Sequence, residues 1–303
     1  MPEITISGAN EITYPILSTW GWQIAAYLFL GGVVAGLLIL GGAFRVRGGA
    51  GFSRATLVGD LSGLPLLSVG MLLLLADLAD KLNVWRLYVT VQLSSPMSWG
   101  SWILLLTMAL LALRFVSAIP VRWKPVQLLR GLARTYDRAL AVVGVVLGIA
   151  VGVYTGVLLS SISARPLWDS AALPFLFLAS GLAGGGAFLC LFLPEKEHRR
   201  LVPFSIGICV VELAVILVYA TTMSGGSDAS RRAAGLLFSG TYGWLFWGVI
   251  VFLGLLVPAT VETLDLLDRR VRYVPARFLP VLKLLGGATL RFVIVYAGLL
   301  SFI

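Results

Sequence analysis

Histidine, cysteine and charged side chains are scarce in this chain of 303 residues. Its one histidine, His198, lies in a loop between apolar segments, so the histidine ligands that usually hold a membrane haem are missing. The two cysteines, Cys190 and Cys209, fall within apolar runs and lack the paired spacing of a zinc site or a disulfide framework. The sequence also has no P-loop and no cluster of metal ligands. We therefore expect this chain to bind neither haem nor metal itself.

Low charge goes together with high hydropathy. Only 12% of the residues are charged, 59% are hydrophobic, and the mean hydropathy is +0.96. This is more apolar surface than one soluble core encloses, so lipid must cover the remainder. A net charge of +9 would suggest nucleic acid in a soluble protein, but here the basic residues lie mostly in loops between apolar segments. The charge therefore indicates a membrane surface, and we expect a lipid bilayer and no nucleic acid as partner.

Eight segments are apolar over the roughly 20 residues that a membrane-spanning helix needs. They cover residues 17–43, 56–78, 97–119, 138–161, 171–193, 203–223, 240–263 and 280–303. Their connections are short, and the acidic start MPEITISGANEITYP lacks the basic stretch of a signal peptide, so we expect the first span to be retained. The sequence predicts an all-α integral membrane protein, a single domain over residues 1–303, with eight transmembrane helices packed as bundles.

The distribution of Lys and Arg predicts the orientation. Most of the 23 basic residues lie in the loops after the first, third, fifth and seventh spans. The loops on the other side hold only Lys81, Arg86, Arg165, Arg231 and Arg232. Because loops rich in Lys and Arg stay in the cytoplasm, both termini are expected outside, in the periplasm of a Gram-negative cell. The protein is then a multi-pass protein of the bacterial cytoplasmic membrane.

Charged residues inside predicted spans are candidates for function because charge in hydrocarbon is costly. Counted along their helices, Glu212 and Arg291 both reach about the middle of the bilayer. We predict that they pair, since each lowers the cost of burying the other. The pair is either a clamp between helices or part of a proton path, which Asp60 would join from the inner side.

A second group of polar residues shares one depth below the outer surface. The rise of their helices brings Tyr27, Asp77 and Tyr154 there from three different spans, with Gln23 one turn from Tyr27 on the same face. Each has an ordinary explanation alone, since aromatic residues favour membrane interfaces and Asp77 can extend to water. Together they suit a lipid-soluble substrate whose polar head exchanges protons.

The glycine-rich stretch GLAGGGA, residues 181–187, is a weak match to a dinucleotide-binding loop. It lies within an apolar span and no strand precedes it, as such a loop requires. It therefore predicts close packing between helices.

Several motifs along the sequence resemble the NrfD/PsrC family of quinone-interacting membrane subunits. They are WGWQIAAYLFLGGVVAG (20–36), SSPMSWGSW (94–102), YTGVLLSSISARPLWDSAALPFLFLASGLAGGGA (154–187), VVELAVIL (210–217), YGWLFWGVIVFLGLLVPA (242–259) and LRFVIVYAGLL (290–300). Their order and spread over nearly the whole sequence make the resemblance specific, and the YTG, LFLASG and LRF blocks are more similar to the NrfD branch than to the polysulfide reductase branch.

The resemblance implies eight transmembrane helices and no redox cofactor of the chain's own. Family members exchange electrons between menaquinone or ubiquinone and a peripheral ferredoxin-like subunit with several iron–sulfur clusters. Beyond that partner lies a molybdenum or tungsten enzyme, or a multihaem cytochrome. The family's quinone pocket lies near the outer face, and its tyrosine on the fourth helix matches Tyr154. A histidine of the polysulfide branch aligns with Tyr27, and an asparagine aligns with Ile24.

We therefore expect a quinone-reactive subunit of a respiratory oxidoreductase complex. Tyr154 would bind one ring oxygen of the quinone with help from Tyr27 or Gln23, and Trp168 would complete the site. Asp77 would accept a proton, and the iron–sulfur partner would dock on the outer surface over residues 82–96 and the loop around Trp168.

Two other classes of function stay open at this point. The first is a passive anchor or a proton-conducting subunit, in which Glu212, Arg291 and Asp60 line the path. The second is a small-molecule transporter, which fits less well because inverted repeats and matched broken helices are missing from the sequence.

Overall fold

The computed structural model describes residues 20–48, 52–78, 81–89, 92, 95–120, 123–162, 164–267 and 277–301. Eight of its helices are long and apolar enough to cross a membrane, which confirms the predicted number of spans. They are α1 (Trp22–Val46), α2 (Ser53–Asp77), α4 (Pro96–Ala118), α6 (Asp137–Ser160), α7 (Leu173–Phe192), α8 (Glu195–Gly225), the continuous helix η2 (Leu245–Leu256) with α10 (Val257–Leu266), and α11 (Phe278–Leu300). The protein is an all-α multi-pass membrane protein.

Several helix ends differ from the predicted ones. α8 begins at Glu195, eight residues before the predicted start at 203, and its first turn holds Glu195 and Glu197, whose charge suits the positive end of a helix. The seventh span begins at Leu245 rather than at 240, and its first part, η2, is a π-helix. Residues 17–19 and 302–303 of the predicted spans lie outside the described residues.

In the part of the chain that the structure describes, four short helices connect the spans, and none of them was predicted. They are η1 (Lys81–Asn83), α3 (Arg86–Val89), α5 (Lys124–Thr135) and α9 (Asp228–Phe238). The two longer ones, α5 and α9, carry polar residues on one side and apolar residues on the other, so their mean hydropathy stays low. Amphipathic helices of this kind escape a search for long apolar runs.

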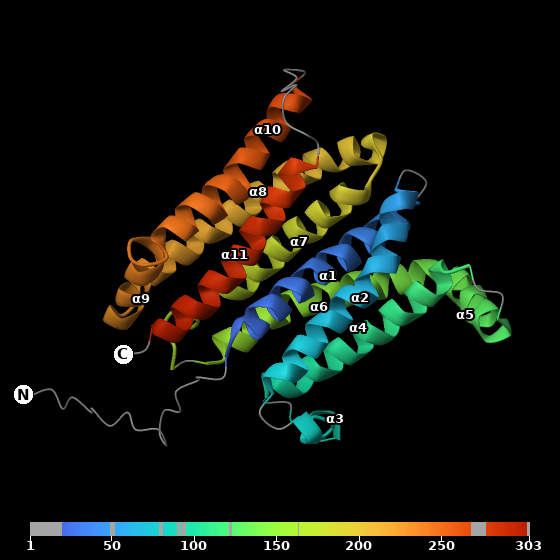
Figure 1. The fold of residues 1–303 in the computed structure, drawn as a ribbon, viewed down its shortest axis with the longest axis horizontal. Helices are drawn as coiled ribbons and strands as arrows, with labels where there is room; N and C mark the ends of the chain where they lie inside the picture. Colours follow the sequence, from blue (N-terminus) through green and yellow to red (C-terminus); the bar gives the residue numbers. More distant parts are fainter. Residues whose placement is uncertain are drawn as a thin grey trace, which may run out of the picture.

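The spans form two neighbouring bundles of four. In the first, α1, α2, α4 and α6 pack against one another, and in the second, α7, α8, α11 and the η2–α10 helix do so. Figure 1 shows the first bundle in blue and green and the second in yellow to red, with α1 and α7 adjacent where the bundles meet. Bundle packing is therefore as predicted.

Glycines bring α1 and α7 into close contact at this boundary. Gly32 and Gly36 on α1 face Gly181 and Gly185 on α7. A Cβ atom on Gly185 would lie 2.6 Å from the Cα of Gly36, so only glycine allows this approach. This confirms close helix packing as the role of the glycine-rich stretch 181–187.

The antiparallel order of the helices defines two faces of the molecule. On one, here called the Tyr27 face, α1 and α4 begin while α2, α6 and α11 end. On the opposite one, the Arg45 face, α1 and α4 end while α2 and α6 begin. The first span therefore begins, and the last span ends, on the same face of the molecule.

Candidate functional site

A cavity of about 420 Å³ opens in the first bundle toward the Tyr27 face. Its walls come from the start of α1, the end of α2, the short helix α3, the start of α4 and the end of α6. The residues that line it are Tyr27, Ser68, Met71, Leu72, Leu74, Leu75, Leu78, Val84, Tyr88, Met97, Ser101, Leu104, Met108, Tyr154 and Leu158. This volume lies in the range of pockets that hold small organic ligands.

Tyr27 lines the cavity from the second turn of α1. The residue is 1% exposed, and its hydroxyl is buried without a hydrogen-bond partner among the described residues. Leaving a buried hydroxyl unpaired costs about 1–3 kcal/mol, so native proteins seldom do so without a reason. A ligand that accepts or donates a hydrogen bond here would remove this cost.

Tyr154 lines the same cavity from α6 and is also buried. Gly100 on α4 makes room for its ring, since a Cβ atom at that position would overlap the Tyr154 ring and hydroxyl. Trp99 makes an edge contact with Tyr154, with the ring centroids 6.2 Å apart. The structure therefore brings together the two tyrosines that were predicted to share one depth.

Most of the remaining wall is apolar, with methionine and leucine side chains and a few hydroxyl groups from Ser68, Ser101 and Tyr88. Sequence reasoning missed these three hydroxyls. Tyr88 lies in a short helix between two spans, and Ser101 lies in the stretch SSPMSWGSW, which was noted as a motif without assigning a role to any residue. Tyr88 is held by an edge contact with Trp102, at 6.5 Å between ring centroids.

Three predicted site residues do not line this cavity. Asp77 ends α2 next to the lining residue Leu78, and its carboxylate accepts a hydrogen bond from the Gly21 N–H at 3.5 Å. Gln23 is half-buried beside Gly21 at the start of α1. Helical rise places a residue at a depth, but its direction around the helix decides which cavity it faces.

The third of these residues, Trp168, has a packing role. It is fully buried, its indole Nε1–H donates to the Ile294 carbonyl at 2.9 Å, and its ring lies 5.4 Å from that of Trp20. Arg165 donates to the Leu299 carbonyl at 2.7 Å, and burial lowers the pKa of its guanidinium. These bonds fasten the connection between α6 and α7 to the end of α11.

Glu212 and Arg291 are both buried, but they do not form the predicted direct ion pair among the described residues. Arg291 instead donates to the Phe177 carbonyl at 2.8 Å, and its guanidinium carbon lies 3.9 Å from the centre of the Phe177 ring. A carbonyl and a ring face on α7 thus stabilise the cation in place of a carboxylate.

A buried ion pair in the second bundle was not predicted. Lys283 on α11 bonds Glu262 on α10 at 2.6 Å and also contacts the hydroxyl of Ser205 on α8. A cavity of about 10 Å³, the size of one water molecule, is lined by both Lys283 and Glu212. Lys283 was not singled out from the sequence, although it lies within the predicted span 280–303 and within α11.

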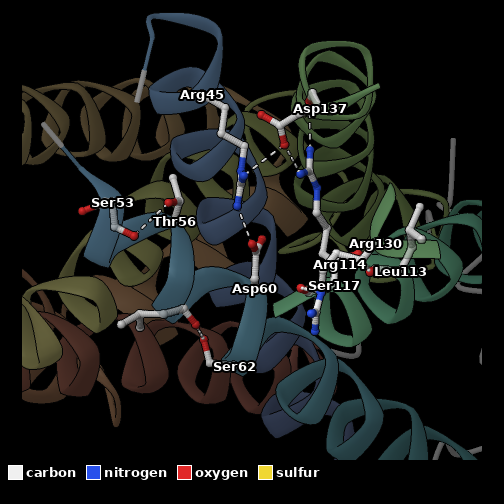
Figure 2. A network of polar contacts seen from close by, with 11 residues as sticks. Arg45, Ser53, Thr56, Asp60, Ser62, Leu113, Arg114, Ser117, Arg130 and Asp137 are labelled. Atoms are coloured by element: carbon white, nitrogen blue, oxygen red, sulfur yellow. Dashed lines mark hydrogen bonds and ion pairs between the residues drawn. The ribbon is translucent and has the colours of Figure 1, made fainter. Parts of the chain in front are cut away.

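Asp60 lies at the Arg45 face, in the first bundle. Arg45 forms ion pairs with both Asp60 and Asp137, and Arg114 forms one with Asp137, as Figure 2 shows. Glu212 and Arg291 lie on helices of the other bundle, so Asp60 belongs to a separate cluster.

Comparison with known proteins gives a consistent result. Residues 10–302 match the family described as "Polysulphide reductase, NrfD". The sequence is 30% identical to "Protein NrfD" of Escherichia coli (strain K12), over 93% of this protein and 95% of that one. It is also 30% identical to one of the chains of the polysulfide reductase of Wolinella succinogenes, over 92% and 94% of the two proteins. The sequence is 24% identical to one of the subunits of the selenate reductase of Mesobacillus selenatarsenatis, over 79% of this protein and 66% of that one.

Proposed function

The chain belongs to the polysulphide reductase NrfD family, whose members are membrane subunits linked to reductase complexes, and from that premise we propose that its cavity at the Tyr27 face binds the head group of a quinol or quinone. The observation that carries this proposal is the buried hydroxyl of Tyr27, which has no protein partner among the described residues and belongs to a cavity that Tyr154 also lines. Menaquinone and ubiquinone both have the chemistry that this site fits.

The composition of the wall supports such a ligand. A quinone ring carries two oxygen atoms on opposite edges, and the cavity supplies the hydroxyls of Tyr27 and Tyr154 from α1 and α6. Pockets for small ligands commonly combine an apolar wall with a few polar groups that fix the orientation. Methionine and leucine side chains form the rest of the surface, which suits the ring faces and the first part of an isoprenoid tail.

Access from the bilayer is also available. Leu72 on α2 lines the cavity and is nevertheless 64% exposed, and Met97 at the start of α4 lines it with 51% exposed. Side chains that contact both the cavity and the lipid mark its opening between these helices. A hydrophobic ligand therefore enters sideways from the membrane.

Proton transfer requires a group near the water-exposed end of the cavity. Oxidation of a quinol releases two electrons to the partner and two protons to protein groups or water. Asp77 is the proposed acceptor because it directly precedes the lining residue Leu78 and is half-buried at the end of α2. Its hydrogen bond from Gly21 holds the carboxylate at the Tyr27 face.

The partner in this proposal is a ferredoxin-like subunit with several iron–sulfur clusters, docked on the Tyr27 face. Exposed apolar side chains of Leu82, Trp85 and Val89 lie next to the cavity on the connection between α2 and α4 and would serve this contact. Beyond this subunit we place a molybdenum or tungsten enzyme or a multihaem cytochrome. The Tyr27 face is then periplasmic, and the membrane is the bacterial cytoplasmic membrane.

Binding of menaquinone to the purified full-length protein in lipid nanodiscs tests the proposal. We expect one equivalent to bind, Tyr154→Phe to weaken binding about five-fold through the loss of roughly 1 kcal/mol, and Tyr296→Phe, a matched change outside the cavity, to leave it unchanged. Wild-type protein that binds no quinone would refute the assignment. In the assembled complex, Asp77→Asn should slow quinol turnover, and full turnover would remove Asp77 from the mechanism.

A proton-conducting subunit is the second candidate. It is favoured by three buried charged residues, Glu262, Lys283 and Glu212. Lys283 forms an ion pair with Glu262, and Lys283 and Glu212 line one water-sized cavity. Potential-driven proton flux into vesicles holding the purified protein, abolished by Glu212→Gln, would support this role. Vesicles that stay proton-tight would exclude it.

A further inference from the structure

A second large cavity lies at the Arg45 face, opposite the proposed quinone site. Its volume is about 340 Å³, and parts of α1, α2, α4, α5 and α6 form its walls. The lining residues are Arg45, Ser53, Thr56, Leu57, Asp60, Arg114, Ser117, Ala118, Arg130, Ala133, Arg134 and Asp137. None of them belongs to the cavity that holds Tyr27.

This cavity carries an excess of positive charge. Its wall contains four arginines and two aspartates, so the acidic side chains neutralise only half of the basic ones. Figure 2 shows Arg45 between Asp60 and Asp137, and Arg114 bonded to Asp137. Arg114 also donates to the Asp137 carbonyl at 3.1 Å. The aspartates thus hold two guanidinium groups in place, and the excess positive charge that remains would attract a further anion.

The two arginines from α5 differ in their contacts. Arg130 donates to the carbonyls of Ser117 and Ile119 and so satisfies the end of α4, where helix carbonyls lack partners. Arg134, one turn later on the same face of α5, is exposed and has no ion-pair partner among the described residues. It is the arginine available to an incoming anion.

The surroundings of the cavity indicate that this anion belongs to a lipid. α5 lies outside the membrane spans and exposes Leu128, Leu129 and Leu132, as a helix in the head-group layer does. Figure 1 shows α5 extending away from the end of the first bundle. On α2, Leu57 lines the cavity and is exposed as well. A free phosphate ion would use the arginines but not these apolar side chains.

We propose that this cavity binds the phosphate group of an anionic phospholipid, with Arg134 and the unused N–H groups of Arg45 and Arg114 as donors. The acyl chains lie along the exposed leucines of α2 and α5. Basic pockets between membrane helices bind anionic head groups in this way. The bound lipid fastens α5 to the bundle and reduces the excess positive charge of the arginine–aspartate cluster.

Native mass spectrometry of the purified full-length protein, titrated with phosphatidylglycerol, phosphatidylcholine or inorganic phosphate, tests this assignment. We expect one phosphatidylglycerol to bind in preference to phosphatidylcholine. Arg134→Ala should weaken that binding about five-fold (about 1 kcal/mol), while Arg138→Ala, an equal charge change at the same face but outside the cavity, should not. Arg134→Glu, which reverses the charge of an exposed side chain, should weaken it further.

Three outcomes would overturn the proposal. Equal binding of both lipids would show that charge is not recognised. Equal losses in Arg134→Ala and Arg138→Ala would show general attraction to the basic face rather than a site. Displacement of the lipid by millimolar inorganic phosphate, with phosphate binding in its place, would identify a free-anion site.

Discussion

Replacing Tyr27 by phenylalanine should stabilise the ligand-free protein and weaken quinone binding at the same time. The hydroxyl is buried without a partner among the described residues, so its removal relieves about 1–3 kcal/mol of desolvation cost. The same change deletes a hydrogen bond to the quinone worth about 1 kcal/mol, which raises Kd roughly five-fold. A residue with a purely structural role would not give opposite signs in the two measurements.

Thermal unfolding in detergent, with and without a menaquinone analogue, measures both effects. At a ligand concentration of about 100 times the wild-type Kd, binding stabilises the wild-type protein by about 2.7 kcal/mol and the variant by about 1.8 kcal/mol. Tyr219→Phe is the matched control because its buried hydroxyl donates to the Leu167 carbonyl at 2.6 Å. That variant should lose about 1–2 kcal/mol of stability without ligand and keep the full gain from the quinone.

Two results would refute this reasoning. If Tyr27→Phe destabilises the ligand-free protein as Tyr219→Phe does, the Tyr27 hydroxyl has a partner in the folded state. If the stabilisation by quinone is the same in Tyr27→Phe and in the wild type, Tyr27 does not contact the ligand.

Because Gly100 lies against the Tyr154 ring, Gly100→Ala should displace this ring and lower quinone affinity at least five-fold. Gly131→Ala on α5, where the added methyl group meets open space, should leave the affinity unchanged. Equal affinities in titrations of the two variants would contradict that geometry. Lys283→Met leaves the Glu262 carboxylate buried and unpaired, so it should cost about 3–5 kcal/mol in unfolding experiments, and adding Glu262→Leu should recover most of this. A double variant as unstable as the single one would show that the pair itself supplies the stability.

Hydropathy was sufficient to predict the eight spans because lipid requires a long apolar run from each of them. The surface helices α5 and α9 were missed because amphipathic helices leave no such run. In the same way, most of the extra residues at the start of α8 are charged, so they belong to the helix without belonging to the apolar segment.

The candidate site was predictable in depth but not in direction. Tyr27 and Tyr154 line one cavity as expected, whereas Asp77 and Gln23, at about the same depth, do not. The predicted Glu212–Arg291 ion pair was wrong for a related reason, because Arg291 contacts the carbonyl and ring of Phe177 on a third helix, α7. Such partners depend on the rotation of packed helices, which one sequence does not encode in any local pattern.

The glycine contact between α1 and α7 has a consequence for biosynthesis. α1 is synthesised first, yet it is buried along most of its length by helices that follow much later in the sequence. Until α7 has been inserted, Gly32 and Gly36 lack the helix against which their backbone packs in the folded protein. The packing of α1 is thus completed only after the later spans α6 and α7 have been inserted, although its neighbour α2 follows it directly.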